Sequence, residues 1–234
     1  MDLAYTVTPL ADSVYELSQG GHVRCFLLVG KERALLVDTC FGGDLRDVVS
    51  RLTDKPVTLV STHADGDHTG ADADFPVHYV HSAELPSYCS YCPDRTPPAT
   101  VEEGYVFDVE PFRLEVVHLP GHTPGSIALL EREKRFLISG DNLATVPVYL
   151  FGATRCVPDY RASLEKLRGM KDAFDVVYPS HGDIPLSPGR IDETLAAIDE
   201  ILAGGGVASE PDNPRFPPEV KVWSAQGCQF LMVR

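Results

Sequence analysis

One short polar segment of the chain carries four side chains that could bind a metal ion. His63, Asp65, Asp67 and His68 fall within six positions, directly after the apolar run 57–61. Imidazole and carboxylate groups together suit a divalent transition metal. A helix would distribute these side chains around its axis, whereas a loop at the end of a strand can turn them toward one point. The segment therefore predicts a metal site in a loop.

The elements that must position these residues can be predicted from periodicity and turn residues. Runs rich in branched and aliphatic residues predict strands at 14–18, 22–29, 34–38, 57–61, 77–80, 112–118, 127–131, 135–139 and 176–178. Apolar residues at helical spacing predict helices at 45–52, 160–170 and 191–202. A short helix is expected from Ser82 to Pro86, followed by a surface loop at 87–100. This order fits two sheets flanked by helices, although periodicity alone allows other α/β layouts.

Composition excludes several classes of protein. The 234 residues carry a net charge of −14 and no basic stripe, so a nucleic-acid partner is not expected. No apolar run approaches the length that spans a bilayer, and the N-terminal residues lack the pattern of a signal peptide. We therefore expect a cytoplasmic protein with six reduced cysteines and no membrane association.

The polar segments, taken in order, resemble the motifs of the metallo-β-lactamase superfamily. Residues 61–70 resemble its signature loop, His-x-His-x-Asp-His, with Asp65 at the place of the second histidine. Residues 119–126, 139–141 and 178–182 resemble its later motifs, and 35–39 resembles its strand that ends in a buried aspartate. The match covers about residues 14–202. The resemblance implies one domain over residues 1–234, an αββα four-layer sandwich with two mixed sheets flanked by helices. The strands expected within 219–234 have no role in this pattern.

The resemblance also implies a site with two divalent metal ions. The first ion would be held by His63, Asp65 and His122, and the second by Asp67, His68 and His181. Asp141 would bridge the two ions together with a water or hydroxide, which is the expected nucleophile. Asp67 and Asp141 are thus the catalytic candidates, and Asp38 is expected to orient ligands rather than to bind metal.

Asp65 distinguishes this chain from the common pattern. A third carboxylate lowers the net positive charge of metals and ligands by one unit, which predicts a weaker Lewis acid. It also moves the site from zinc, the usual ion, toward manganese or iron, because these ions favour oxygen ligands more strongly.

Two irregular segments, 85–100 and 142–158, are candidates for substrate recognition. Their aromatic residues could wall an apolar pocket, and their arginine could anchor a carboxylate: Tyr88, Tyr91, Tyr149, Phe151 and Arg155. The alternative is that both are surface loops whose aromatic residues cover the edge of the core. The remaining histidines, His22, His78, His81 and His118, match no ligand motif and are expected to be structural, and the role of the Cys89-x-x-Cys92 pair stays open.

The motifs favour a hydrolase in which a metal-bound hydroxide attacks a small ester, thioester or lactone. One alternative is a diiron-type reductase of oxygen or nitric oxide, which would need a separate electron donor. Another is a metal-binding sensor module without turnover. The expected partner is a small-molecule substrate, and a homodimer is possible.

Overall fold

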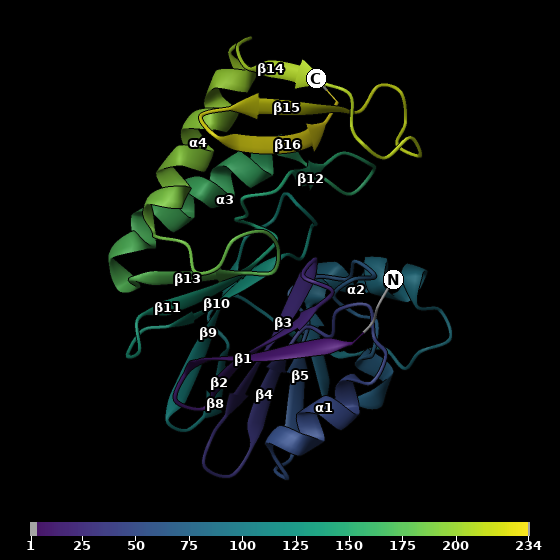
Figure 1. Cartoon of the computed structure of the whole chain (residues 1–234), viewed down its shortest axis with the longest axis vertical. Helices are drawn as coiled ribbons and strands as arrows, with labels where there is room; N and C mark the ends of the chain where they lie inside the picture. Colours follow the sequence, from purple (N-terminus) through teal and green to yellow (C-terminus); the bar gives the residue numbers. More distant parts are fainter. Residues whose placement is uncertain (1–3, 234) are drawn as a thin grey trace.

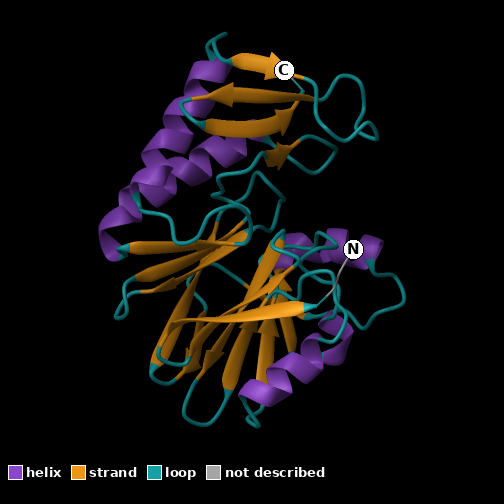
Figure 2. Ribbon diagram, viewed as in Figure 1, coloured by secondary structure: helices purple, strands orange, loops and turns teal. Residues whose placement is uncertain are grey.

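The computed structural model describes residues 4–233. The N-terminal half of the chain forms a seven-stranded mixed sheet (Figures 1 and 2). The first four strands are antiparallel, and the last three continue the sheet in parallel. In sheet order they are β1 (Tyr5–Ala11), β2 (Val14–Gln19), β3 (Val23–Val29), β4 (Ala34–Val37), β5 (Val57–Val60), β6 (His78–His81) and β7 (Ala99–Val101).

A second, five-stranded sheet packs on the first. Only its β11–β13 pair is parallel, so this sheet is also mixed. Its order is β13 (Val176–Pro179), β11 (Phe136–Gly140), β10 (Ile127–Glu131), β9 (Phe112–His118) and β8 (Val106–Val109). The core between the sheets is apolar, with Phe26 and Val60 from the first sheet beside Leu114, Leu129 and Ile138 from the second.

Helices cover the outer face of each sheet. Helix α1 (Leu45–Leu52) packs on the seven-stranded sheet through Leu45, Val48 and Val49. The other helices are α2 (Leu85–Tyr91), α3 (Val157–Met170) and α4 (Gly189–Leu202), with 3-10 turns at Asp72–Asp74, Ser82–Glu84 and Lys171–Ala173. The expected αββα sandwich with two mixed sheets is therefore confirmed. None of the helices within residues 4–233 has the length and apolarity needed to cross a membrane.

A third sheet extends this architecture. The strands β12 (Val148–Leu150), β16 (Cys228–Met232), β15 (Lys221–Ala225) and β14 (Val207–Ser209) form a four-stranded sheet in that order. Figure 1 shows that α3 and α4 lie between this sheet and the five-stranded one. One continuous apolar cluster joins them, with Leu164 of α3, Ile198 of α4 and Phe230 of β16 all buried in it. The expected final pair of strands is confirmed as the β15–β16 hairpin, and it belongs to its own sheet.

The region after β6 differs from our prediction. We expected Pro86 to end a short helix, but it lies in the first turn of α2, which continues to Tyr91. Proline is favoured there because its fixed φ suits a helix start and its missing N–H has no helical partner to lose. Strands β1, which has seven residues, and β12, which has three, were also not predicted.

The direction of the strands brings the polar segments to one edge of the sandwich. Strands β4 and β5 are parallel, so Asp38 and the loop that begins at Ser61 leave the first sheet at the same edge. In the second sheet, β9, β11 and β13 run in one direction, because β10 is antiparallel to both β9 and β11. His122, Asp141 and His181 therefore follow the carboxyl ends of strands that share a direction.

Candidate metal centre

The first group of candidate ligands consists of His63, Asp65 and His122. Their ligand atoms lie within 4.8 Å of one another. The Nε2 atoms of His63 and His122 are 3.1 Å apart, and Oδ2 of Asp65 lies 3.7 Å and 3.4 Å from them. Both imidazoles are buried, and the three side chains form a compact cluster.

The second group consists of Asp67, His68 and His181, whose ligand atoms also fall within 4.8 Å. Nε2 of His181 is 3.3 Å from Oδ2 of Asp67, and Nε2 of His68 is 3.9 Å from Oδ1 of Asp67. The signature loop thus divides its four candidates between two clusters, with two residues in each.

Asp141 lies between the two groups. Its Oδ1 is 3.3 Å from Nε2 of His68 and 3.5 Å from Nε2 of His181, in the second group. Its Oδ2 is 3.7 Å from Nε2 of His122, in the first group. One carboxylate oxygen therefore faces each cluster, which is the placement that a bridging ligand requires.

The ring orientation of the two signature-loop histidines is fixed by Asp38. Nδ1 of His68 donates to Oδ2 of Asp38 at 2.8 Å. The same carboxylate accepts from the backbone N–H and from Oγ1 of Thr62, and Nδ1 of His63 lies 3.0 Å from that hydroxyl. Because the Nδ1 atoms are engaged, the Nε2 atoms of both rings point into the centre. Asp38 therefore lies behind the ligands, as expected.

Backbone carbonyl groups orient the other two rings. Nδ1 of His122 donates to the carbonyl of Tyr149 at 2.8 Å, and Nδ1 of His181 donates to the carbonyl of His22 at 2.6 Å. Such outer hydrogen bonds set the tautomer that presents Nε2 to a metal. The contribution of His22 was not predicted, because a backbone acceptor has no sequence signature.

The arrangement of donor atoms fits a divalent transition metal. With each Nδ1 engaged, the Nε2 atoms of His63 and His122 present lone pairs to each other at 3.1 Å, which is unfavourable unless a cation lies between them. Nε2 of His68 and Oδ1 of Asp141 are buried and have no hydrogen-bond partner. Tetrahedral zinc with bonds of 2.0–2.1 Å holds its donor atoms about 3.3 Å apart, close to the separations found here.

The electrostatics of the described residues also favour a cation at this place. Burial raises the pKa of Asp141, but the neighbouring His181 and His68 hold it well below its usual range. Burial lowers the pKa of His68, yet the carboxylates of Asp141, Asp38 and Asp67 raise it well above the ordinary value. The carboxylates therefore remain anionic, and their negative charge stabilises a cation at this buried position.

Arg155 makes a contact with the site that differs from our prediction. We expected it to anchor a substrate carboxylate, but its guanidinium donates from Nη2 to Oδ2 of Asp65. Arg155 is not among the described residues that line the cavity, and its role toward a substrate stays a prediction.

The buried carboxylate of Glu84 connects the signature loop to the loop that carries His122. Its Oε1 accepts from the N–H of Ala64 at 3.0 Å, and its Oε2 accepts from Oγ1 of Thr123 and the N–H of Gly125, both at 2.8 Å. A Cβ at Gly125 would lie 2.4 Å from the backbone nitrogen of Glu84, so only glycine permits this approach. Glu84 was not predicted from the sequence.

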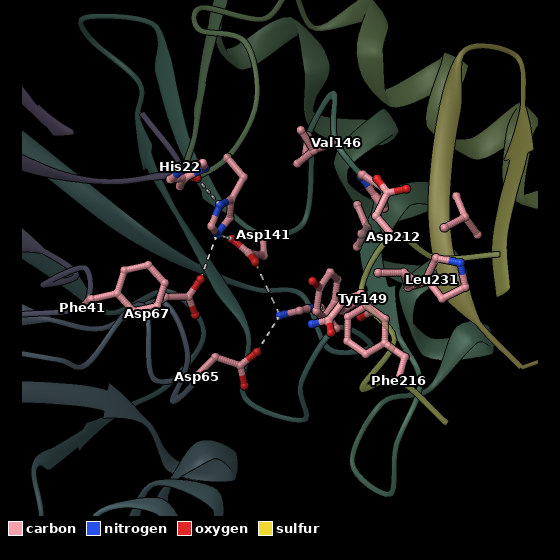
Figure 3. A pocket seen from close by; sticks show the side chains of 18 residues that line it. His22, Phe41, Asp65, Asp67, Asp141, Val146, Tyr149, Asp212, Phe216 and Leu231 are labelled. Carbon is pink, nitrogen blue, oxygen red and sulfur yellow. Dashed lines mark hydrogen bonds and ion pairs between the residues drawn. The ribbon is translucent and has the colours of Figure 1, made fainter. Parts of the chain in front are cut away.

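The site opens into a cavity of about 430 Å³ (Figure 3). Five of the seven candidate ligands line it, whereas His63 and His68 lie behind them and are fully buried. Its other lining residues come from His22, from Phe41, from the segment 144–149 and from the C-terminal sheet and the loop before it. A substrate in this cavity would therefore have direct access to the metal ligands.

Only part of the expected substrate-binding set reaches this cavity. Tyr149 lines it, and Phe151 packs against Tyr149 with ring centroids 5.8 Å apart. Tyr88 is buried and donates to Asp72, and Tyr91 is exposed on α2; neither lines the cavity. Of the two candidate recognition segments, 142–158 thus contributes to the site and 85–100 does not.

The remaining histidines and the cysteine pair lie outside the ligand cluster. His81 stacks on His118 at 3.8 Å, and Nε2 of His78 lies 2.9 Å from Oγ of Ser61. Cys89 and Cys92 are both free thiols. These three histidine rings contact neighbours outside the ligand cluster, whereas His22, also expected to be structural, lines the cavity.

Comparison with known proteins agrees with the geometry. The model of the metallo-β-lactamase superfamily matches residues 19–181. A metallo-β-lactamase from Pontibacter korlensis superposes with a TM-score of 0.72 at 18% identity, covering 84% of this chain and 99% of that one. At this identity the likeness shows the fold alone.

Three of the relatives with named activities illustrate the range. An acyl-coenzyme A thioesterase of Gallus gallus is 26% identical over 220 residues, covering 74% of this chain and 79% of that protein. A hydroxyacylglutathione hydrolase of Haemophilus influenzae is 28% identical over 144 residues, covering 51% and 66%. An atrochrysone carboxyl ACP thioesterase of Paecilomyces divaricatus is 34% identical over 175 residues, covering 70% of this chain and 52% of its own length. Because the family match contains every one of the converging side chains from His63 to His181, this chain belongs to the metallo-β-lactamase superfamily and is a hydrolase.

Proposed function

We propose that the chain is a metal-dependent thioester hydrolase with a dinuclear site. The observation that carries this proposal is the position of Asp141, whose two oxygens face two separate ligand groups at the end of one cavity. His63, Asp65 and His122 would hold one ion, Asp67, His68 and His181 the other, and Asp141 would bridge them. The named activities of the relatives favour thioesters over other small acyl compounds.

Divalent ions at such a site polarise a carbonyl oxygen and lower the pKa of water toward neutrality. Asp67 and Asp141 face the cavity and would orient the attacking water, with a carboxylate oxygen to accept its proton. Water adds to the carbonyl carbon, the C–S bond breaks, and the sulfur leaves and takes up a proton. The products are a carboxylic acid and a thiol.

Two measurements on the purified protein test this proposal together. Elemental analysis should find about two equivalents of zinc, manganese or iron, and a panel of thioester, lactone and phosphodiester substrates should show fastest turnover of a thioester. Loss of turnover on chelation, with recovery on adding metal, is also expected. Iron with a visible absorption band and no hydrolysis of any substrate would instead support the oxygen or nitric oxide reductase. Bound metal without turnover or redox chemistry would support a sensor module.

A further inference from the structure

The cavity extends from the metal centre to the C-terminal sheet. Figure 3 shows Asp65, Asp67 and Asp141 at one end, and Phe216, Leu231 and Asp212 at the other. We call the second end the distal arm and define it by six residues. They are Val146, Val148, Asp212, Phe216, Val222 and Leu231.

The distal arm is a built part of the fold, although its residues come from three separate segments. Strand β12 pairs in parallel with β16, which places Val148 beside Phe230 and Tyr149 beside Leu231. The ring of Phe216 packs edge-on against Tyr149, with centroids 5.6 Å apart. Leu231 and Val148 are almost fully buried, so the walls are fixed by packing.

The distal arm is also connected to the metal centre through the backbone. The carbonyl of Tyr149, at the middle of β12, accepts the hydrogen bond from Nδ1 of His122. The same strand therefore orients a candidate metal ligand and supplies part of the apolar wall. A substrate carbonyl at the metals and a chain extending along β12 would occupy one continuous space.

The charge of the lining restricts what this space can bind. Among the described residues that line the cavity, none is a lysine or an arginine. Arg155 carries the nearest positive charge to the ligand cluster, and its guanidinium is paired with Asp65. Apart from the three ligand carboxylates, three histidines and Tyr149, Asp212 is the one ionisable side chain among the described residues that line the cavity. An anionic group in the distal arm would thus lie near a carboxylate and find no cation to neutralise it.

We propose that the distal arm binds the acyl chain of the thioester, that this chain is apolar and uncharged, and that Asp212 discriminates against acyl chains ending in a carboxylate. This inference rests on the proposed thioesterase function and narrows its substrate class. The five apolar side chains of the arm bury the chain, and the thiol leaving group remains on the solvent side of the metals. A carrier with anionic groups is accommodated only because those groups stay outside the arm.

The test compares three thioesters of N-acetylcysteamine, a neutral leaving group, that share a three-methylene spacer. The acyl groups are 5,5-dimethylhexanoyl (neutral), glutaryl (anionic) and 4-trimethylammoniobutanoyl (cationic). The metal-loaded full chain should hydrolyse the neutral compound with a kcat/KM at least about tenfold above that of the glutaryl compound. Equal values for these two, or a tenfold preference for the cationic compound over the neutral one, would overturn the inference.

Asp212→Lys tests the role assigned to Asp212. The ratio of the kcat/KM for the glutaryl compound to that for the 5,5-dimethylhexanoyl compound should rise at least about fivefold. Glu219→Lys is the matched control, because it makes the same charge change on an exposed residue of the same segment that does not line the cavity. An equal rise in both variants would show that overall charge, rather than Asp212, sets the preference.

A binding measurement separates failure of this inference from failure of the proposed function. If no thioester is hydrolysed, the proposed function is wrong, and the arm is then tested by calorimetric titration with the free acids. The inference predicts that 5,5-dimethylhexanoate binds at least about tenfold more tightly than glutarate. Equal binding of the two acids, with or without turnover, contradicts the apolar acyl site.

Discussion

The guanidinium of Arg155 donates from Nη2 to Oδ2 of Asp65, the residue that stands where the superfamily's signature loop has its second histidine. Both side chains are largely buried, with 14% and 20% of their surface exposed. The positive charge of Arg155 therefore offsets the additional negative charge of Asp65. We expected Asp65 to make the metal centre more anionic than the common pattern and therefore a weaker Lewis acid. Because the ion pair cancels the added charge, this weakening no longer follows. The preference of a carboxylate oxygen for manganese or iron is unaffected.

The pairing predicts that neither residue can be changed alone without cost. Asp65→His leaves a buried guanidinium without its partner, and Arg155→Met leaves an uncompensated carboxylate. Each should lower the free energy of unfolding by about 2 kcal/mol, while the double variant should lose at least about 1 kcal/mol less than the sum. The measurement is urea denaturation of metal-free protein, so that altered metal binding does not contribute.

A surface pair provides the control for this cycle. Arg132 donates to Glu115 at 2.7 Å, but half of the arginine side chain is exposed. The same cycle with Arg132→Met and Glu115→His should give a coupling below about 1 kcal/mol. A coupling at Asp65 and Arg155 no larger than this surface value would contradict an important role for the buried pair.

The two ligand groups predict separate losses of metal. His122→Ala removes a donor only from the first group, and His181→Ala only from the second. Each variant should retain about one equivalent of metal after dialysis, against about two for the unmodified chain. His118→Ala is the control, because this ring stacks on His81 outside the cluster, and it should retain both. A His181→Ala protein that still holds two equivalents would refute the second site.

The candidate ligands could be named from the sequence because they form short motifs directly after strands. Four of them lie in one loop, so local order grouped these four, whereas the resemblance to the superfamily added His122, Asp141 and His181. The αββα sandwich also followed from that resemblance, because apolar runs alone allow other α/β layouts. Where the pattern was ambiguous, as at Pro86, the prediction was wrong because proline is compatible both with the end and with the first turn of a helix.

The walls of the cavity could not be predicted, because they depend on contacts between distant segments. Leu231 reaches the cavity because β16 pairs with β12, about eighty residues earlier in the chain, and the ring of Phe216 packs there against Tyr149. Tyr88 was assigned to the substrate because it is an aromatic residue in an irregular segment. The structure instead buries it on α2, where its hydroxyl satisfies Asp72. Local sequence does not distinguish these two environments.

The hydrogen bonds of Glu84 predict that the stability of the fold and the affinity for the first metal ion are coupled. In the unmodified chain, three donors from Ala64, Thr123 and Gly125 share the two carboxylate oxygens of Glu84. The amide of Glu84→Gln offers only one oxygen. The free energy of unfolding should fall by about 2 kcal/mol, because at least one buried donor loses its acceptor. Metal affinity at the group containing His122 should also fall, as measured by titration with a chromophoric chelator.

Glu32→Gln is the control for this variant, because Glu32 is exposed in a turn far from the metal centre. It should change stability by less than about 0.5 kcal/mol and leave metal affinity unaltered. Unchanged stability of Glu84→Gln would show that its three hydrogen bonds do not hold the two loops together.

His78 predicts a dependence of stability on pH that is independent of the metal ligands. Burial lowers the pKa of His78 from its ordinary value of 6.5 to about 4, because the charged ring would lose its hydration. The unfolded chain therefore binds a proton at this residue between pH 6.5 and pH 4, and the folded chain does not. Stability is fully present above pH 6.5 and falls as the pH drops toward 4, by up to about 3 kcal/mol.

The measurement is the difference in unfolding free energy between the unmodified chain and His78→Gln, taken in urea at several pH values without metal. The amide of glutamine does not titrate, so the variant should lose less stability between pH 6.5 and pH 4. The difference between the two proteins should therefore shrink or reverse as the pH falls. Parallel stability curves for His78→Gln and the unmodified chain would show that the folded protein accepts a proton on His78 as readily as the unfolded chain does.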